Sequence, residues 1–334
     1  MHRLRPLLLL FAALGSGLSA NVLPEISAGP LVGHVTESTA GLWMYAPVES
    51  KVTVRYWPES EEGEAEEGAL KAYENPIAEG DGHPVCVTLD GLMANRAYRY
   101  VVSVDGASDP TWQGSFSTAP QKGSPGKFRV AVTSCMKVGQ PQASWYLLLA
   151  QRPDLHLTLG DTHYADTTEP AVQLDHHVRY RREPYHAAVL RQVPTYSIWD
   201  DHDYGPNNSD GTAEGKENSL HGWTQCWMNP GAGTDEVPGA FYRFTRGEVE
   251  FFAVDGRYHR SPDKAPDDEH KRMLGDGQFK WLVESLANSK AKFKVVFSGS
   301  TLQDSKGDGW RIYTFARQRL IDTLREKGIS GVVY

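Results

Sequence analysis

The stretch WDDHDY, residues 199–204, places three carboxylates and an imidazole in sequence at the end of the predicted buried strand Thr195–Trp199. A second stretch, LGDTHY at residues 159–164, ends the predicted strand Leu155–Leu159 with another carboxylate. In open α/β sheets, ligands bind beyond the carboxyl ends of the strands. Carboxylates crowded at such an edge raise one another's pKa and cost free energy unless cations neutralise them. The two stretches therefore predict a layered α/β domain with a metal site at one edge of a sheet.

Strands and helices alternate outward from these two stretches. Further predicted strands are Phe128–Thr133, which has the composition of a buried strand, Glu248–Val254, Lys294–Phe297 and Ile329–Tyr334. Predicted helices are Pro141–Gln151, Glu169–Arg191 and Phe315–Lys327. This alternation is typical of an α/β layered domain, which we place at residues 126–334. Cys135 and Asp255 also follow predicted strands, although a single Asp after a strand is more often a helix cap than a ligand.

A different pattern precedes residue 120. Residues 24–119 hold short runs rich in β-branched and aromatic residues, separated by Gly, Pro, Asp and Asn at intervals that suit a β-sandwich. Residues 120–127, PQKGSPGK, are typical of a linker. The sequence therefore predicts a multidomain α/β protein with an all-β N-terminal domain.

The first twenty residues are typical of a cleavable export signal, although a short buried helix is the alternative. Arg3 and Arg5 give a basic start, Leu7–Leu14 an apolar run and residues 16–20 a small-residue exit. The apolar run is too short to span a bilayer, which needs about 20 residues. Because Leu4 separates the two arginines, the signal has no twin-arginine pair. We expect export to the periplasm or the extracellular space.

Composition limits the partners of the chain. Its 334 residues include 34 Lys and Arg against 42 Asp and Glu, a net charge of −8 that disfavours a nonspecific nucleic-acid surface. Phosphate substrates are not excluded, because bound metal ions add local positive charge. No stretch after the signal is apolar enough to span a membrane. The cysteines are Cys86, Cys135 and Cys226, so at least one thiol is free or coordinated. The oligomeric state stays open.

Five motifs, in their order and spacing, resemble the alkaline phosphatase D family from about residue 28 to the end of the chain. They are Ser134-Cys135, Gly160-Asp161-x-x-Tyr164, Trp199-Asp200-Asp201-His202-Asp203, Asp255-x-Arg257-x-x-Arg260 and Met273-Leu274-Gly275-x-x-Gln278-x-x-Trp281-Leu282. Members of that family are secreted metallophosphoesterases. The resemblance implies a fibronectin-type-III-like β-sandwich followed by an α/β/β/α metallophosphoesterase sandwich.

The resemblance also implies which residues bind metal and substrate. The implied metal ligands are Cys135, Asp161 and Tyr164 for Fe³⁺, with Asp161 bridging to Ca²⁺, then Asp201 and Asn207 for Ca²⁺, and Asp200 as a ligand or a supporting carboxylate. Other divalent cations are an alternative. The implied catalytic residues are Asp161, His202 and Arg257, and the implied substrate-binding residues are His202, Arg257 and Arg260. The arginines of residues 179–182 are an alternative phosphate contact, or else a solvated helix face.

The expected activity is hydrolysis of phosphomonoesters, phosphodiesters or both, in small molecules or polymers, by attack of a metal-activated hydroxide. In the family, a strand such as Ile329–Tyr334 leads into a Gly-Asp-x-His segment and a further His that complete both metal sites. Neither follows here, so we expect a C-terminally incomplete catalytic domain with little turnover of its own. The alternative function is non-catalytic ligand binding on a degenerate phosphoesterase scaffold.

Overall fold

The computed structural model describes residues 26–59, 69–74, 82–303, 307 and 309–334. The predicted export signal, residues 1–20, lies outside this part of the chain. Among the described helices, none is long and apolar enough to cross a membrane.

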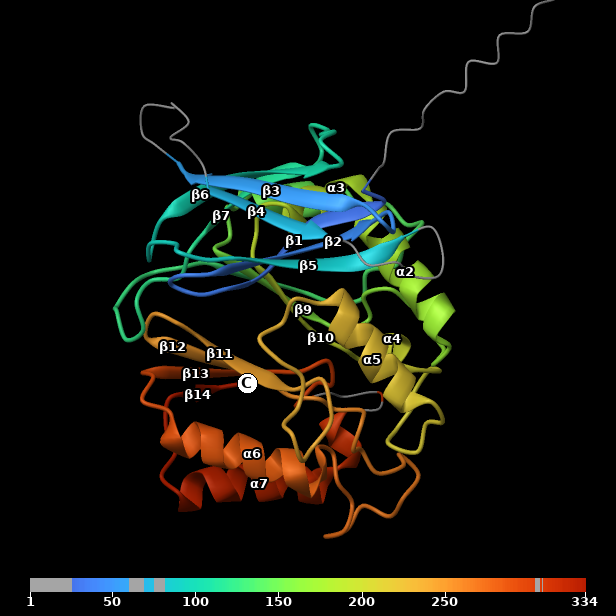
Figure 1. The fold of residues 1–334 in the computed structure, drawn as a ribbon. Helices are drawn as coiled ribbons and strands as arrows, with labels where there is room; N and C mark the ends of the chain where they lie inside the picture. Colours follow the sequence, from blue (N-terminus) through green and yellow to red (C-terminus); the bar gives the residue numbers. More distant parts are fainter. Residues whose placement is uncertain (1–25, 60–68, 75–81, 304–306, 308) are drawn as a thin grey trace, which may run out of the picture.

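Antiparallel strands form a β-sandwich in the N-terminal part of the described chain (Figure 1). One sheet has the strand order β1–β2–β5 and the other the order β4–β3–β6–β7. The strands are β1 (Ala28–Val35), β2 (Ala40–Ala46), β3 (Lys51–Pro58), β4 (Ala69–Glu74), β5 (His83–Leu89), β6 (Ala97–Val104) and β7 (Gln113–Ser117). Val52, Val54 and Val102 alternate with more exposed residues along their strands and are fully buried in the core of the sandwich. The prediction of a β-rich N-terminal region is confirmed.

A parallel sheet with the order β10–β9–β8 begins the second part of the chain. Its strands are β8 (Val130–Thr133), β9 (Leu155–Leu159) and β10 (Thr195–Ile198). Because the strands are parallel, their carboxyl ends meet at one edge, where the two polar stretches follow. The prediction that Phe128–Thr133 is a buried strand is wrong. β8 is an edge strand of the described sheet, and 55% of Val132 is exposed.

Three helices pack on the outer face of this sheet. They are α1 (Ser144–Ala150), α2 (Pro170–Arg182) and α3 (Pro184–Leu190). Trp145 of α1 meets the ring of His156 on β9 edge-on, with 5.6 Å between ring centroids. The single predicted helix over residues 169–191 is corrected to two, because Glu183 is extended and Pro184 begins a new helix. An extended conformation before proline is the expected one, since proline disfavours the helical region for the residue before it.

A mixed sheet with the order β11–β12–β13–β14 lies against the parallel sheet. Its strands are β11 (Tyr242–Arg246), β12 (Val249–Ala253), β13 (Phe293–Phe297) and β14 (Val332–Val333). Phe251 and Phe297 belong to the core shared with the parallel sheet. Phe252 and Val296 point to the other face, which α6 (Gly275–Asn288) and α7 (Thr314–Glu326) cover at the bottom of Figure 1. The second part of the chain therefore has α/β/β/α layers. The remaining helices are α4 (Asp201–Tyr204), α5 (Lys216–Cys226) and the 3₁₀ turn η1 (Trp310–Ile312).

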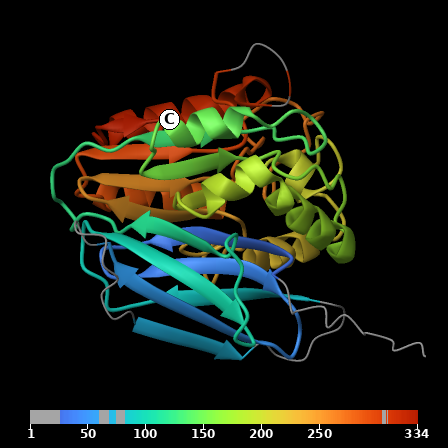
Figure 2. The ribbon, with the colours of Figure 1, turned by 90° about the horizontal axis from the view of Figure 1, so that it is seen from above.

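The sandwich packs directly against the α/β part, as both ribbon views show (Figures 1 and 2). The guanidinium of Arg181 lies between two indole rings, 4.3 Å from the centroid of Trp43 on β2 and 4.4 Å from that of Trp227. The side chain of Arg182 donates to the carbonyl of Ser27 at 2.6 Å. Arg181 is 1% exposed, so the prediction of a solvated helix face is wrong for this residue. It joins the two parts of the protein.

Candidate metal centre

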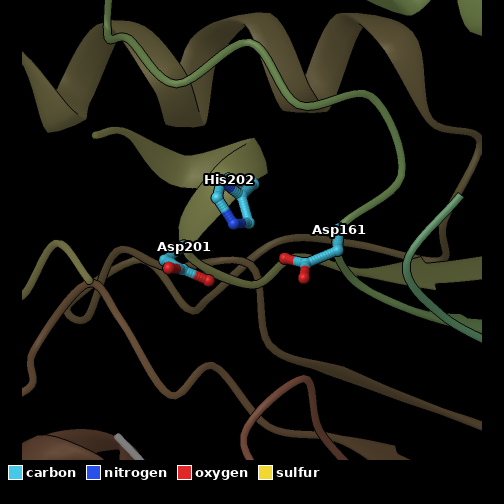
Figure 3. A group of neighbouring side chains, drawn as sticks. All are labelled: Asp161, Asp201 and His202. Carbon is cyan, nitrogen blue, oxygen red and sulfur yellow. The ribbon is translucent and has the colours of Figure 1, made fainter. Parts of the chain in front are cut away.

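The loops that follow β9 and β10 meet at the carboxyl edge of the parallel sheet. Asp161, Asp201 and His202 each offer one ligand atom within 4.8 Å of the others (Figure 3). Gly160 makes this approach possible, because a Cβ at that position would lie 2.4 Å from the backbone nitrogen of Asp200. Its φ of +82° is also a conformation that residues with side chains rarely adopt. The three side chains form a group that fits a metal ion.

Two further predicted ligands lie against the same carboxylate. The Cys135 sulfur is 3.4 Å and the Tyr164 phenol oxygen 3.5 Å from Oδ2 of Asp161. All three residues have φ between 50° and 58°, in the left-handed region. Such conformations are uncommon outside glycine and gather at functional sites, where the surrounding structure enforces them. The structure therefore brings the thiol, the phenol and the carboxylate together.

A buried carboxylate fixes the two loops to each other. Oδ1 of Asp203 accepts hydrogen bonds from the backbone N–H of Thr162 at 2.7 Å, from its hydroxyl at 2.8 Å and from the backbone N–H of His163 at 3.1 Å. Oδ2 of Asp203 accepts from the backbone N–H of Asp200 at 3.2 Å. Sequence reasoning missed this role, although Asp203 belongs to the quoted motif.

Arg257 lies beneath the carboxylates. Its guanidinium is fully buried, donates from Nε to Oδ1 of Asp200 at 2.6 Å and lies 3.5 Å from Oδ1 of Asp201. Asp255 supports this arginine, because its Oδ1 accepts from the backbone N–H groups of Arg257 at 2.8 Å and Tyr258 at 3.0 Å. Asp255 is therefore a structural carboxylate, as a single Asp after a strand usually is.

The remaining predicted residues lie elsewhere or at the rim. Arg260 is buried and contacts Oδ1 of Asp263 at 2.6 Å and the hydroxyl of Tyr313 at 2.7 Å. Asn207 is exposed in the turn after α4. The backbone N–H of its neighbour Asn208 donates to Oδ2 of Asp201 at 2.7 Å, which holds this turn against the group.

His202 has two partners that sequence reasoning did not identify. Its Nδ1 hydrogen-bonds to Oδ1 of Asp166, and its ring lies 4.4 Å from that of Tyr164. Burial lowers the pKa of His202, but the hydrogen bond to Asp166 and the charges of Asp201 and Asp161 together raise it above its usual value. The only signal for Asp166 in the sequence is its position five residues after Asp161.

The electrostatics of the group favour a bound cation. Oδ1 of Asp161 is buried and has no hydrogen-bond partner among the described residues. Burial, followed by the charges of Asp203 and Asp201, raises the pKa of Asp161 to about 6. Burial and the charge of Asp161 also raise the pKa of Cys135 and Tyr164. A cation reverses each of these effects, because it stabilises the deprotonated forms. The residues present therefore fit a metal centre.

Comparisons with known proteins agree with this arrangement. A family model described as PhoD-like phosphatase matches residues 130–334, and a model of a domain of unknown function matches residues 23–122. No curated protein matches the sequence. The solved structure of PhoD has a TM-score of 0.73 at 18% identity, over 92% of this chain and 70% of that one. The purple acid phosphatase PPD1 of yellow lupin (Lupinus luteus) has a TM-score of 0.62 at 14% identity, over 90% of this chain and 56% of that one. These two likenesses show the fold, and the match over residues 130–334 shows that the chain belongs to the PhoD-like phosphatase family.

Proposed function

We propose that the protein is an exported, metal-dependent phosphoesterase that hydrolyses phosphomonoesters, phosphodiesters or both. The observation that carries this proposal is the convergence of Asp161, Asp201 and His202 at the carboxyl edge of the sheet. Within this group, Oδ1 of Asp161 is buried and has no hydrogen-bond partner among the described residues. Membership of a phosphatase family supports the reaction class. Export rests on the predicted signal in residues 1–20.

The donor atoms support a division of the centre between two kinds of cation. Cys135, Asp161 and Tyr164 offer a thiolate, a carboxylate and a phenolate, which as anionic donors suit Fe³⁺. Asp201 and Asn207 offer oxygen donors of the kind that Ca²⁺ prefers, and the carboxylate of Asp161 would be available to either ion. Bound cations would supply Lewis acidity and lower the pKa of a water molecule.

The other residues position this centre and its substrate. Because Asp200 already receives the Nε–H of Arg257, we assign it a supporting role. The guanidinium of Arg257 neutralises the charges of Asp200 and Asp201 and orients both carboxylates. His202 offers a ring nitrogen beside Asp161 and Asp201, where the neutral ring would bind a cation and the protonated ring would donate an N–H to a phosphoryl oxygen. Arg260 has its own ion pair with Asp263, which favours a structural role.

Turnover with and without cations tests the proposal. Purified protein would be assayed on 4-nitrophenyl phosphate and on bis(4-nitrophenyl) phosphate, as isolated, after EDTA, and after addition of Ca²⁺ and Fe³⁺, with metal content measured in parallel. Because little turnover is expected of this chain, the assay measures its residual rate of hydrolysis, which we expect chelation to abolish and re-addition to restore. Hydrolysis that survives complete metal removal would contradict the mechanism. A metal-loaded protein that binds phosphate without turnover would instead indicate the non-catalytic binding function.

A further inference from the structure

Asp166 and His202 contact each other twice, although 36 positions separate them. The side chain of Asp166 accepts a hydrogen bond from Nδ1 of the imidazole. The backbone N–H of Asp166 also donates to the carbonyl oxygen of His202, at 3.2 Å. The carboxylate and the backbone of one residue thus hold both the ring and the main chain of the other.

Burial does not explain this pairing. The side chain of Asp166 is 47% exposed, so water could hydrate its carboxylate without the histidine. Exposed ion pairs add little to stability. Asp166 also has a φ of 54°, a left-handed conformation that asparagine and aspartate tolerate better than other residues with side chains. The loop therefore holds the carboxylate at Nδ1 for a reason other than filling a core.

The consequence lies at the other ring nitrogen. An ionised carboxylate can only accept hydrogen bonds, so Nδ1 of His202 must carry the proton of the neutral ring. Its Nε2 is then the nitrogen with a free lone pair. Figure 3 shows the ring above the space between Asp161 and Asp201. Tyr164 restricts the ring from the side, with an interplanar angle of 35°.

We propose that Asp166 is a positioning residue that fixes the orientation of His202 and keeps its proton on Nδ1, so that the Nε2 lone pair faces the Asp161–Asp201 group. This inference rests on the proposed function for its purpose, but the tautomer itself is a property of the chain alone. Carboxylates that orient a ligand histidine through its second nitrogen strengthen cation binding in the same way.

Asp166→Asn is the informative variant. Asparagine has the same shape and tolerates the same left-handed backbone, so the bond from residue 166 to the carbonyl of His202 is kept. Its amide can turn an N–H toward Nδ1, which moves the proton of the neutral ring to Nε2 and points an N–H at the cation group. Asp175→Asn, at an exposed carboxylate 3.7 Å from Arg179 on α2, is the matched control with the same loss of charge.

The first measurement reads the tautomer. Metal-free protein labelled with ¹⁵N-histidine would be studied at pH 9 by long-range ¹H–¹⁵N spectra, with His202→Gln to assign the signal. We expect the Nδ1–H tautomer in the wild type and in Asp175→Asn, and the Nε2–H tautomer or a mixture in Asp166→Asn. An Nε2–H wild type, or a tautomer unchanged in Asp166→Asn, would overturn the proposal. A protein without phosphatase activity still gives this answer, so the two proposals fail separately.

The second measurement reads cation affinity, with Ca²⁺ and Mn²⁺ alone as probes in calorimetric titrations. We expect Asp166→Asn to weaken binding about 10- to 100-fold and Asp175→Asn to leave it within twofold. A changed tautomer with unchanged affinity would reduce the pair to a local contact and overturn the positioning role. Thermal unfolding of all variants checks that the fold is kept. The variant Asp166→Ala, whose side chain cannot form a hydrogen bond with Nδ1, must also bind the cations more weakly.

Discussion

Asp203 accepts hydrogen bonds from both the backbone N–H and the hydroxyl of Thr162, at 2.7 and 2.8 Å. Thr162 follows Asp161, and Asp203 lies in the first turn of α4, so this pair joins the loop after β9 to the loop after β10. The carboxylate is 1% exposed. Asp203 therefore holds Asp161, in the loop after β9, at a fixed distance from Asp201 and His202, in the loop after β10.

Asp203→Asn should loosen this connection. An amide at this position can still accept from Thr162, but its NH₂ would then face the backbone N–H of Asp200, and two buried donors without an acceptor cost about 1–3 kcal/mol. We expect urea unfolding to show a loss of about 2 kcal/mol and Ca²⁺ titration to show weaker binding. The exposed Asp175→Asn is the control. Unchanged stability and affinity in Asp203→Asn would mean that other contacts fix the loops.

Asp161→Asn should separate activity from stability. The change removes the carboxylate that both cations would share, and we expect phosphoesterase activity to fall about 10³-fold or more. Metal-free stability at pH 8 should be unchanged or increased, because the neighbouring charges of Asp201 and Asp203 no longer repel a third. Rates on 4-nitrophenyl phosphate and urea unfolding on the same preparation decide this. Near-normal activity in Asp161→Asn would exclude a shared carboxylate.

The colour of the protein should report on the iron ligands. If Fe³⁺ binds Cys135 and Tyr164, the metal-loaded protein has a ligand-to-metal charge-transfer band in the visible spectrum. Tyr164→Phe and Cys135→Ser should each shift or bleach it, since each removes one anionic donor. Tyr146→Phe, on an exposed tyrosine of α1, is the control. A colourless, iron-free protein with full activity on other cations would make Tyr164 a packing residue.

The strand pattern was sufficient for an α/β layered domain and for placing Cys135 and Asp161 at one edge of a sheet, while the family resemblance implied Tyr164 and the order of the layers. Parallel strands end at one edge, so polar residues placed directly after them must gather there. The sequence was insufficient where a residue's environment comes from distant segments. Arg257 and Arg260 lie three residues apart in one motif, yet of these two only Arg257 contacts the site carboxylates. Arg260 instead contacts Asp263 and Tyr313, the residue that precedes α7. No local pattern contains that information.

Arg181 shows the same limit and gives a prediction about domain docking. The sequence left open whether it contacts phosphate or belongs to a solvated helix face, yet it lies between Trp43 and Trp227. Arg181→Ala should lower the free energy of unfolding by about 3 kcal/mol, through lost cation–π contacts and lost hydrogen bonds. Arg179→Ala on the exposed side of the same helix should stay within about 0.5 kcal/mol of the wild type. KM should change in neither variant. Equal stabilities for the two variants would contradict the docking role.

Acid should destabilise the protein through His156, which is fully buried between two hydroxyls. Its Nε2 lies 2.7 Å from the Thr133 oxygen and its Nδ1 3.4 Å from the Thr195 oxygen. Burial lowers its pKa from 6.5 to about 4. Between these two values the unfolded chain binds a proton that the folded chain does not, so stability falls as pH falls, by about 1.4 kcal/mol per pH unit.

His156→Gln should remove that slope, because glutamine can hydrogen-bond to the hydroxyls but takes up no proton in this range. Urea unfolding of metal-free protein at pH 7.5, 5.5 and 4.5 would measure it. We expect the variant to be less stable than the wild type at pH 7.5, because glutamine packs imperfectly. Its free energy of unfolding should nevertheless fall less steeply with falling pH, by about the 1.4 kcal/mol per pH unit that one proton contributes. His270→Gln, at a side chain that is 83% exposed, is the control and should keep the wild-type slope. Parallel slopes for His156→Gln and the wild type would show that His156 takes up its proton equally in both states, and the acid sensitivity would then belong to other buried groups.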